Sequence, residues 1–344
     1  MLTMELYINS TGLVSAAGSG TVADLPVAAG TGEVRLSAKE PDYTGMIPPM
    51  QLRRMSKAVR ISIAASKICL QNAGIEKPDA ISVGTAMGCL QDTEQFLAKM
   101  IAQEEQMLTP TAFIQSTHNT VSGQIALLCG CHGHNLTYVH RGHSFEHALI
   151  NTQLYLQQHP GETVLAGGLD ELVDTSFSLM QRAGVYRTDA ATHYGAVAGE
   201  GAAFFTVTGQ QREGSVLRIK DLHLFVAKDE ATTSQKLQHF LSGIRLSDVG
   251  ILLSGDSGDD RYAPFYKALH ETFSGSSIFA FKQLSGEYGT ASAAGLSLIT
   301  DMVQKQSFPA HVFLDNKVPA RAKQVVMINN YLDHYSCWMI DVIS

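Results

Sequence analysis

Five side chains that could take part in catalysis or metal binding lie in one short stretch of this 344-residue chain. The stretch is His-Arg-Gly-His-Ser-Phe-Glu-His, at positions 140–147. They are His140, His143, Ser144, Glu146 and His147. If a helix begins near Ser144, His143 and His147 lie four positions apart and share one face. Such a histidine pair can bind zinc when further ligands join it. A serine beside a histidine base can instead act as a nucleophile in a hydrolase or an acyltransferase.

The spacing of the other histidines does not identify a third metal ligand. His118, His132 and His134 are the candidates that could approach the pair in space. We therefore expect neither a metal nor a cofactor. A hydrolase or acyltransferase that uses the cluster of histidines, Ser144 and Glu146 is kept as an alternative hypothesis, because Ser144 has His143 directly before it.

The composition bounds the class of protein. The chain is 45% hydrophobic and 17% charged, with a formal net charge of −7 and a pI of about 6.0. No basic stripe is visible, so we expect no nucleic acid partner. No run of eighteen apolar residues occurs, so we expect no membrane span. The N-terminus lacks signal-peptide features, and five irregularly spaced cysteines favour reduced thiols and a cytoplasmic location.

Short apolar runs alternate with amphipathic stretches, which is typical of a layered α/β protein. Polar residues flanked by glycine at 210–214 form the best internal boundary. The order strand, helix, strand, helix, strand appears again after it, which indicates a structural duplication. The predicted helices span 52–72, 94–106, 121–129, 145–158, 234–241 and 263–273. The predicted strands span 6–12, 80–84, 136–140, 163–168, 202–207, 216–227, 250–254 and 277–281.

Six short motifs follow one another along the chain. They are Tyr-Ile-Asn-Ser-Thr-Gly-Leu-Val-Ser at 7–15, Leu-Arg-Arg-Met at 52–55, Asn-Thr-Val-Ser-Gly-Gln-Ile-Ala at 119–126, Ala-Gly-Gly at 166–168, Gly-Glu-Gly-Ala at 199–202 and Lys-Gln-Leu-Ser-Gly-Glu at 282–287. In this order and spacing they resemble the motifs of β-ketoacyl-acyl-carrier-protein synthases. The resemblance implies a thiolase-like fold: two duplicated βαβαβαββ halves, residues 1–212 and 213–344, in five α-β-α-β-α layers.

The departures from that family concern its chemistry. The resemblance implies a nucleophilic cysteine at a helix start, which takes the acyl group, and two histidines that stabilise the enolate. The matching positions hold Gly142, Ser254 and Glu287, and no cysteine lies between residues 136 and 150. Of the catalytic positions only Lys282 remains, and we expect it to pair with Glu287, with Asp256 or a cluster histidine as a further partner.

A gating loop of the family, Gly-Phe-Gly-Gly, is replaced here by Leu332, Asp333, His334 and Tyr335. Glycine allows backbone shapes that these residues mostly cannot adopt. The pocket that this loop serves is therefore expected to differ from that of an active synthase.

The resemblance also implies a dimer in which the strand at 136–140 pairs across a two-fold axis, with the histidine cluster as a hydrogen-bonded seam. The main hypothesis is a non-condensing homologue, similar to the chain-length-factor subunits of fatty-acid, polyketide or aryl-polyene biosynthesis. Its partner would be a catalytic ketosynthase or a second copy, with an acyl carrier protein as an additional partner. A homodimeric acyl-binding module is a further alternative.

Overall fold

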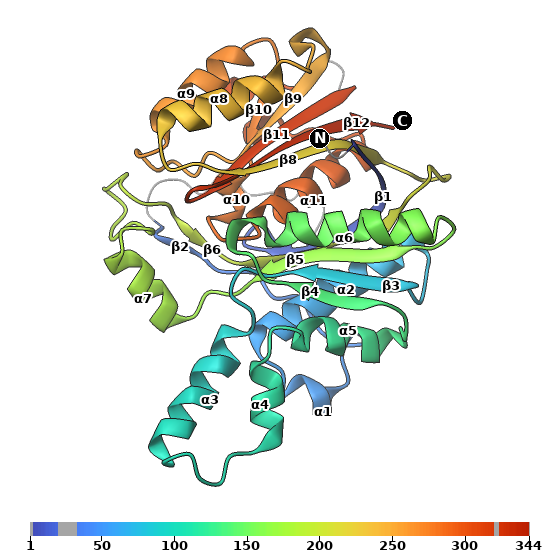
Figure 1. The fold of residues 1–344 in the computed structure, drawn as a ribbon, viewed down its shortest axis with the longest axis vertical. Helices are drawn as coiled ribbons and strands as arrows, with labels where there is room; N and C mark the ends of the chain where they lie inside the picture. Colours follow the sequence, from blue (N-terminus) through green and yellow to red (C-terminus); the bar gives the residue numbers. More distant parts are fainter. Residues whose placement is uncertain (1–2, 20–32, 320–322, 344) are drawn as a thin grey trace.

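The computed structural model describes residues 3–19, 33–319 and 323–343 and shows helices and strands in alternating layers (Figure 1). The first half contains β1 (Thr3–Ser15), α2 (Lys57–Ala73), β3 (Ala80–Gly84), α5 (Thr120–Cys129), β4 (Asn135–Tyr138), α6 (Ser144–Gln158), β5 (Val164–Asp170) and β7 (Gly201–Thr208). The second half contains β8 (Leu217–Val226), α8 (Glu230–Leu241), β9 (Val249–Ser254), α9 (Ala263–Thr272), β10 (Ser277–Ala280), α11 (Ala291–Gln304), β11 (Gln324–Tyr331) and β12 (His334–Val342).

The two halves have the same sheet topology. The strand orders are β4-β3-β5-β7-β1 and β10-β9-β11-β12-β8. When the strands of each half are numbered along the chain, both orders become 3-2-4-5-1. β1 and β8, each at the end of its own half's five strands, pair antiparallel and join the two five-stranded sheets into one hydrogen-bonded set of ten strands. The predicted duplication is therefore confirmed, although no residue-level repeat is visible in the sequence.

Three hydrophobic clusters separate the layers. In the first, α2 residues such as Ile61 pack on the first sheet with Phe204 of β7. In the second, Phe145 of α6 and Leu296 of α11 lie between the sheets. In the third, Phe240 of α8 and Tyr266 of α9 cover the second sheet. The sequence of layers is α, β, α, β, α, as Figure 1 shows from α2 and α5 up to α8 and α9, so the predicted five-layer arrangement is confirmed.

The remaining helices and strands are short and lie around these layers. They are β2 (Arg35–Leu36), α1 (Pro49–Leu52), α3 (Leu90–Ala102), α4 (Pro110–Ser116), η2 (Arg141–His143), α7 (Asp174–Arg182), β6 (Ala198–Gly199), η3 (Leu246–Asp248), α10 (Lys282–Ser285), η4 (Ala310–Val312) and η5 (Leu314–Asn316). The helix predicted at 94–106 is α3, which begins and ends four residues earlier. No helix among the described residues is long and apolar enough to cross a membrane. The proposed division at 212/213 falls in the connection between β7 and β8, and it stays a prediction.

Candidate functional site

Gly142 is buried in a turn and leaves no room for a side chain of its own. The turn is η2, directly before α6, and it faces the end of β11 and the start of β12. A Cβ atom added at Gly142 would lie 2.7 Å from Cβ of Tyr331 and 3.0 Å from Cβ of His334. Contacts that short do not occur between real side chains, so the backbone would have to move. The space that a nucleophilic side chain at this turn would need is filled by Tyr331 and His334.

Lys282 and Glu287 form the predicted ion pair. The Nζ atom of Lys282 lies 2.9 Å from Oε2 of Glu287, and the two residues are 2% and 6% exposed. Lys282 also donates to the carbonyl of Asn330. Gly286, at φ 74°, ends α10 and lets the chain turn so that Glu287 faces back toward the lysine. Burial raises the pKa of Glu287, and the nearby ammonium opposes that rise.

Asp256 does not join this pair. Its carboxylate accepts the backbone N–H of Gly258 at 2.9 Å instead. The additional partner of Lys282 is thus a backbone carbonyl, and the expectation of Asp256 or a cluster histidine in that role is wrong. Strand pairing explains this, because the end of β11 brings the carbonyl of Asn330 beside α10.

The hydroxyl of Ser254 is bonded to groups other than Lys282 and Glu287. Its hydroxyl hydrogen-bonds Nε2 of His270 on α9 at 3.0 Å and accepts the Asp256 backbone N–H at 3.3 Å. Residues two apart on a strand share a face, and Leu252 of the same strand packs in the outer cluster with α9. The Ser254 side chain therefore faces the outer helix layer.

The histidines of the 140–147 stretch do converge, and a fourth joins them. The ring centroids of His140 and His147 are 4.5 Å apart, and those of His143 and His334 are 4.8 Å apart. The additional histidine comes from the predicted pocket loop, so the earlier candidates for this role, His118, His132 and His134, were wrong. The sequence alone does not indicate His334 as a neighbour, because β12 belongs to the other half of the chain and approaches α6 only in the folded structure.

Ser144 and Glu146 do not face these rings. The Ser144 hydroxyl donates to the carbonyl of Arg141 at 2.7 Å and accepts the backbone N–H of His140 at 2.8 Å, so it stabilises the turn. Glu146 is fully buried, and neither of its oxygens has a hydrogen-bond partner among the described residues. Burial raises its pKa to about 7. Among the described residues the Ser144 hydroxyl is hydrogen-bonded to backbone groups and not to a histidine ring, so the geometry does not support a hydrolase built on this cluster.

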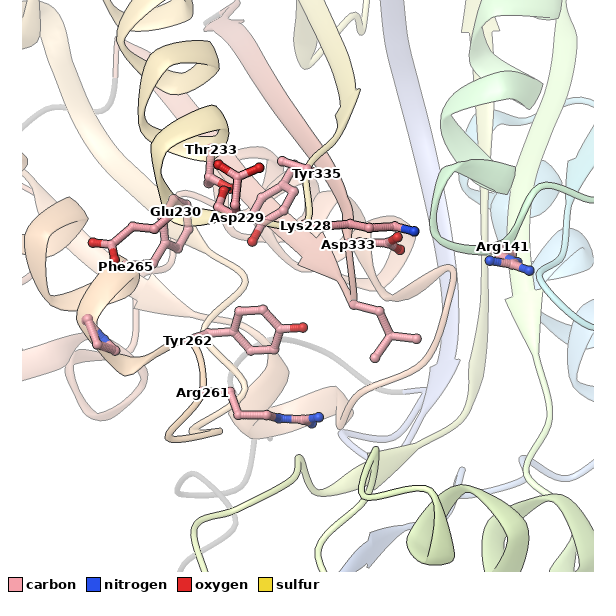
Figure 2. Close-up of a pocket in the computed structure, with 13 residues that line it drawn as sticks. Arg141, Lys228, Asp229, Glu230, Thr233, Arg261, Tyr262, Phe265, Asp333 and Tyr335 are labelled. Atoms are coloured by element: carbon pink, nitrogen blue, oxygen red, sulfur yellow. Dashed lines mark hydrogen bonds between the residues drawn. The ribbon is translucent and has the colours of Figure 1, made fainter.

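A cleft of about 580 Å³ opens beside the turn that carries Gly142. Its walls come from that turn, the β11–β12 turn and the starts of α8 and α9. Figure 2 shows Arg141 on one side, Tyr262 and Arg261 on the other, and Lys228 and Asp333 between them. Leu332, Asp333 and Tyr335 line the cleft, as expected for a pocket loop, whereas His334 belongs to the histidine cluster.

The backbone of the pocket loop corrects the expectation that its residues mostly cannot adopt the backbone shapes of glycine. Leu332 has φ 53°, in the left-handed region that favours glycine. Pairing of Tyr331 with His334 leaves only two residues to close the β11–β12 hairpin, and a positive φ at the first of them suits such tight turns. The hydrogen bonds between β11 and β12 hold Leu332 at this positive φ. A leucine at a position where the family's loop has glycine is therefore compatible with the turn.

Sequence reasoning missed Asp170 at the end of β5. This buried carboxylate accepts hydrogen bonds from Thr85 Oγ1 and the backbone N–H groups of Ala86 and Met87. It also accepts the backbone N–H and the hydroxyl of Thr290. Burial raises its pKa to about 6. An acidic residue directly after the buried Val-Leu-Ala-Gly-Gly-Leu run was the available signal.

Comparisons with known proteins agree with this architecture. A family model described as the N-terminal domain of β-ketoacyl synthases matches residues 31–240, more than half of the chain. A search of curated protein sequences finds no match. Among solved structures, a β-ketoacyl synthase from Burkholderia phymatum STM815 superposes with a TM-score of 0.75 at 16% identity, covering 99% of this chain and 100% of that one.

Two further structures contain chain length factors. The ishigamide ketosynthase/chain length factor gives a TM-score of 0.78 at 15% identity, with 99% of this chain and 100% of that chain covered. A ketosynthase in complex with its chain length factor, ApeO with ApeC from Xenorhabdus doucetiae, gives 0.74 at 14% identity, with 98% of each chain covered. These likenesses show a shared thiolase-like fold. Together with the family model they establish that the chain belongs to the β-ketoacyl synthase family.

Proposed function

We propose that this chain is a non-condensing β-ketoacyl synthase homologue that acts as the chain-length-factor-like partner of a catalytic ketosynthase. The observation that carries the proposal is the packing around Gly142. A condensing enzyme needs a nucleophile that can hold the acyl group, whereas Gly142 has no side chain and the space beside it is filled by Tyr331.

The charges beside this turn support the same conclusion. Stabilising an enolate requires hydrogen-bond donors aimed at the developing negative charge. Glu287 is an acid, and its partner Lys282 is already engaged by that carboxylate and by the Asn330 carbonyl. The Ser254 hydroxyl faces His270 in the outer layer. These three residues therefore give no donor set for decarboxylative condensation.

An exposed strand edge supports a protein partner. Within the described part of the chain β4 pairs only with β3 and lies at the end of the sheet. Open sheet edges are templates for pairing with another chain. Large apolar side chains surround this edge, with Leu136 and Val139 exposed on and after β4, Leu127 on α5 and Leu154 on α6. Apolar surface of this kind marks interaction sites.

The partnership that we propose is a heterodimer across β4, in which the chain helps to shape the acyl tunnel of its partner in polyketide, aryl-polyene or fatty-acid biosynthesis. The names of two structural neighbours, each a ketosynthase with a chain length factor, are consistent with this role. An acyl carrier protein is the additional partner that we propose. The five cysteines are unpaired, and we propose a cytoplasmic setting.

Two measurements test the proposal. The purified chain should show no condensation of acyl and malonyl thioesters, and turnover by the chain alone would overturn the proposal. Co-expression with ketosynthases that have an intact cysteine and both histidines should yield a stable complex. Leu136→Arg, on the β4 edge, should abolish that complex. The matched change Leu246→Arg, at an exposed leucine of η3 in the other half, should leave it intact.

Two results of the co-expression experiment count against a partner role. If the chain forms a homodimer through β4 and recruits none of these synthases, the acyl-binding homodimeric module becomes the better description. A chain that stays monomeric at micromolar concentration with every candidate synthase would exclude both descriptions, because interfaces of this obligate kind usually bury more than about 2,000 Å².

A further inference from the structure

Three histidines from both halves of the chain meet beside Gly142. His140 and His143 come from the turn before α6, and His334 is the first residue of β12. One ring nitrogen from each lies within 4.8 Å of the other two. The proposed role as a ketosynthase partner does not account for this convergence, since it needs only that Gly142 carries no nucleophile.

Hydrogen bonds orient two of the rings. Nε2 of His143 lies 3.0 Å from the carbonyl oxygen of Tyr335, and a carbonyl can only accept, so Nε2 carries the proton. Nδ1 of His334 lies 2.8 Å from Oδ1 of Asp333, which assigns the proton to Nδ1. When the two imidazoles are neutral, the nitrogens left to bind a metal ion are Nδ1 of His143 and Nε2 of His334. Metal-bound histidines have this arrangement, with the second N–H donated to a carbonyl or a carboxylate.

Burial and access also fit a ligand site. His143 and His334 are 4% and 7% exposed, whereas His140 is exposed to solvent. The group of three histidines therefore borders solvent at His140.

We propose that His140, His143 and His334 together bind one late first-row divalent metal ion, of which zinc is the representative. At the usual zinc–nitrogen distance of about 2.0–2.1 Å, tetrahedral ligands stand about 3.4 Å apart. The ring nitrogens, which lie within 4.8 Å of one another, would have to approach by up to about 1.4 Å through side-chain rotations. A water molecule or His147, whose ring is 4.5 Å from that of His140, completes the coordination.

The donor set determines the class of metal. Three neutral imidazoles suit zinc, copper, nickel or cobalt, whereas magnesium and calcium prefer oxygen ligands. Asp333 offsets part of the added charge through His334. The bound ion would fasten the β11–β12 turn, which lines the cleft, to the turn that carries Gly142. It would act as a clamp between the two halves.

Calorimetric titration of the metal-free chain with zinc chloride tests this site. We expect one zinc ion per chain. His143→Ala and His334→Ala should each weaken binding by at least about 100-fold, since even outer-shell changes cost 10- to 100-fold. Asp333→Asn should weaken it by about 10-fold. His193→Ala, at an exposed histidine outside the cluster, should bind as the unaltered chain does.

Cobalt(II) gives a second readout that does not depend on buried substitutions. The cobalt-loaded chain should show visible d–d absorption of a nitrogen-coordinated ion, and His140→Ala, at the exposed ligand, should remove it without unfolding the protein. The inference is overturned if the chain takes up no zinc at micromolar concentration. It is also overturned if all three histidine variants bind zinc as tightly as the unaltered chain, which would point to the cysteines. Neither result bears on the partner role.

Discussion

The Nζ atom of Lys282 lies 2.9 Å from the Glu287 carboxylate in a site where both residues are almost sealed from solvent. Water barely reaches either group, so each charge depends on the other for compensation. The pair occupies two positions of a motif that resembles a catalytic one, and we expect its role here to be structural.

Breaking this pair should be costly. Removing one partner leaves an uncompensated buried charge, which typically costs about 3–5 kcal/mol. Glu287→Ala should therefore lower the free energy of unfolding by that order, as measured by urea denaturation. The double change Lys282→Met with Glu287→Gln should cost less, because no unpaired charge remains. Asp248→Ala, which breaks the exposed Arg245–Asp248 pair, should cost less than about 1 kcal/mol. Unchanged stability of Glu287→Ala would contradict the role of the pair.

Adding a side chain at Gly142 should destabilise the protein without restoring activity. Gly142→Ala and Gly142→Cys place Cβ 2.7 Å from Cβ of Tyr331, and overpacking of this kind typically costs about 1–3 kcal/mol. Thermal unfolding should show the loss, and Gly142→Cys should show no condensing activity. Gly123→Ala is the matched control: nothing lies within 4 Å of its added Cβ, and α5 should gain about 0.5–1 kcal/mol. A stable, condensing Gly142→Cys variant would refute this interpretation of the turn.

The stability of the protein should depend on pH through Glu146. Burial raises the pKa of Glu146 in the folded state to about 7 from 4.5. Between pH 4.5 and pH 7 the folded protein therefore keeps a proton on this carboxyl that the unfolded chain has released. This contribution is therefore fully present below pH 4.5 and is lost as the pH rises toward 7, with a span of about 3 kcal/mol.

Glu146→Gln isolates that contribution from the other buried acids. The variant should be more stable than the unaltered chain at pH 8 and about equally stable at pH 5, as measured by urea denaturation at both values. Asp170 and Glu171 also have raised pKa values, but both remain in the variant, so their pH dependence cancels in the comparison. A stability difference that is the same at both pH values would show that Glu146 does not titrate in this range.

Replacing Asp170 should lower the stability of the protein, because its carboxylate is the shared acceptor for several buried donors. Its two oxygens accept five hydrogen bonds, from Thr85, Ala86, Met87 and Thr290. Asp170→Ala leaves these buried donors unpaired, at about 1–3 kcal/mol for each group that water cannot reach. Asp170→Asn keeps one acceptor oxygen and should cost less. Thermal melting of both variants checks this order, and equal melting temperatures would contradict it.

Much of the fold could be predicted from local patterns. The strand at 80–84 was located to the residue, and the helix at 145–158 differs from α6 by one residue, because continuous apolar runs and helical spacing are strong local signals. The small helices α4 and α7 and the C-terminal elements α11, β11 and β12 were not individually predicted. The identities of Gly142, Ser254 and Glu287 also required no structure, and neither did the pairing of Lys282 with a glutamate five residues away.

The contacts between residues that are far apart in the sequence depend on the tertiary structure alone. His334 joins His140 and His143 because β12 packs beside the turn before α6. Ser254 turns toward His270 because the alternation of a strand assigns its side chain to the outer face. Tyr331 fills the space above Gly142 through the β11–β12 hairpin. Local sequence determines periodicity and turn chemistry, whereas these contacts depend on how two duplicated sheets meet, and no single segment of the chain encodes that meeting.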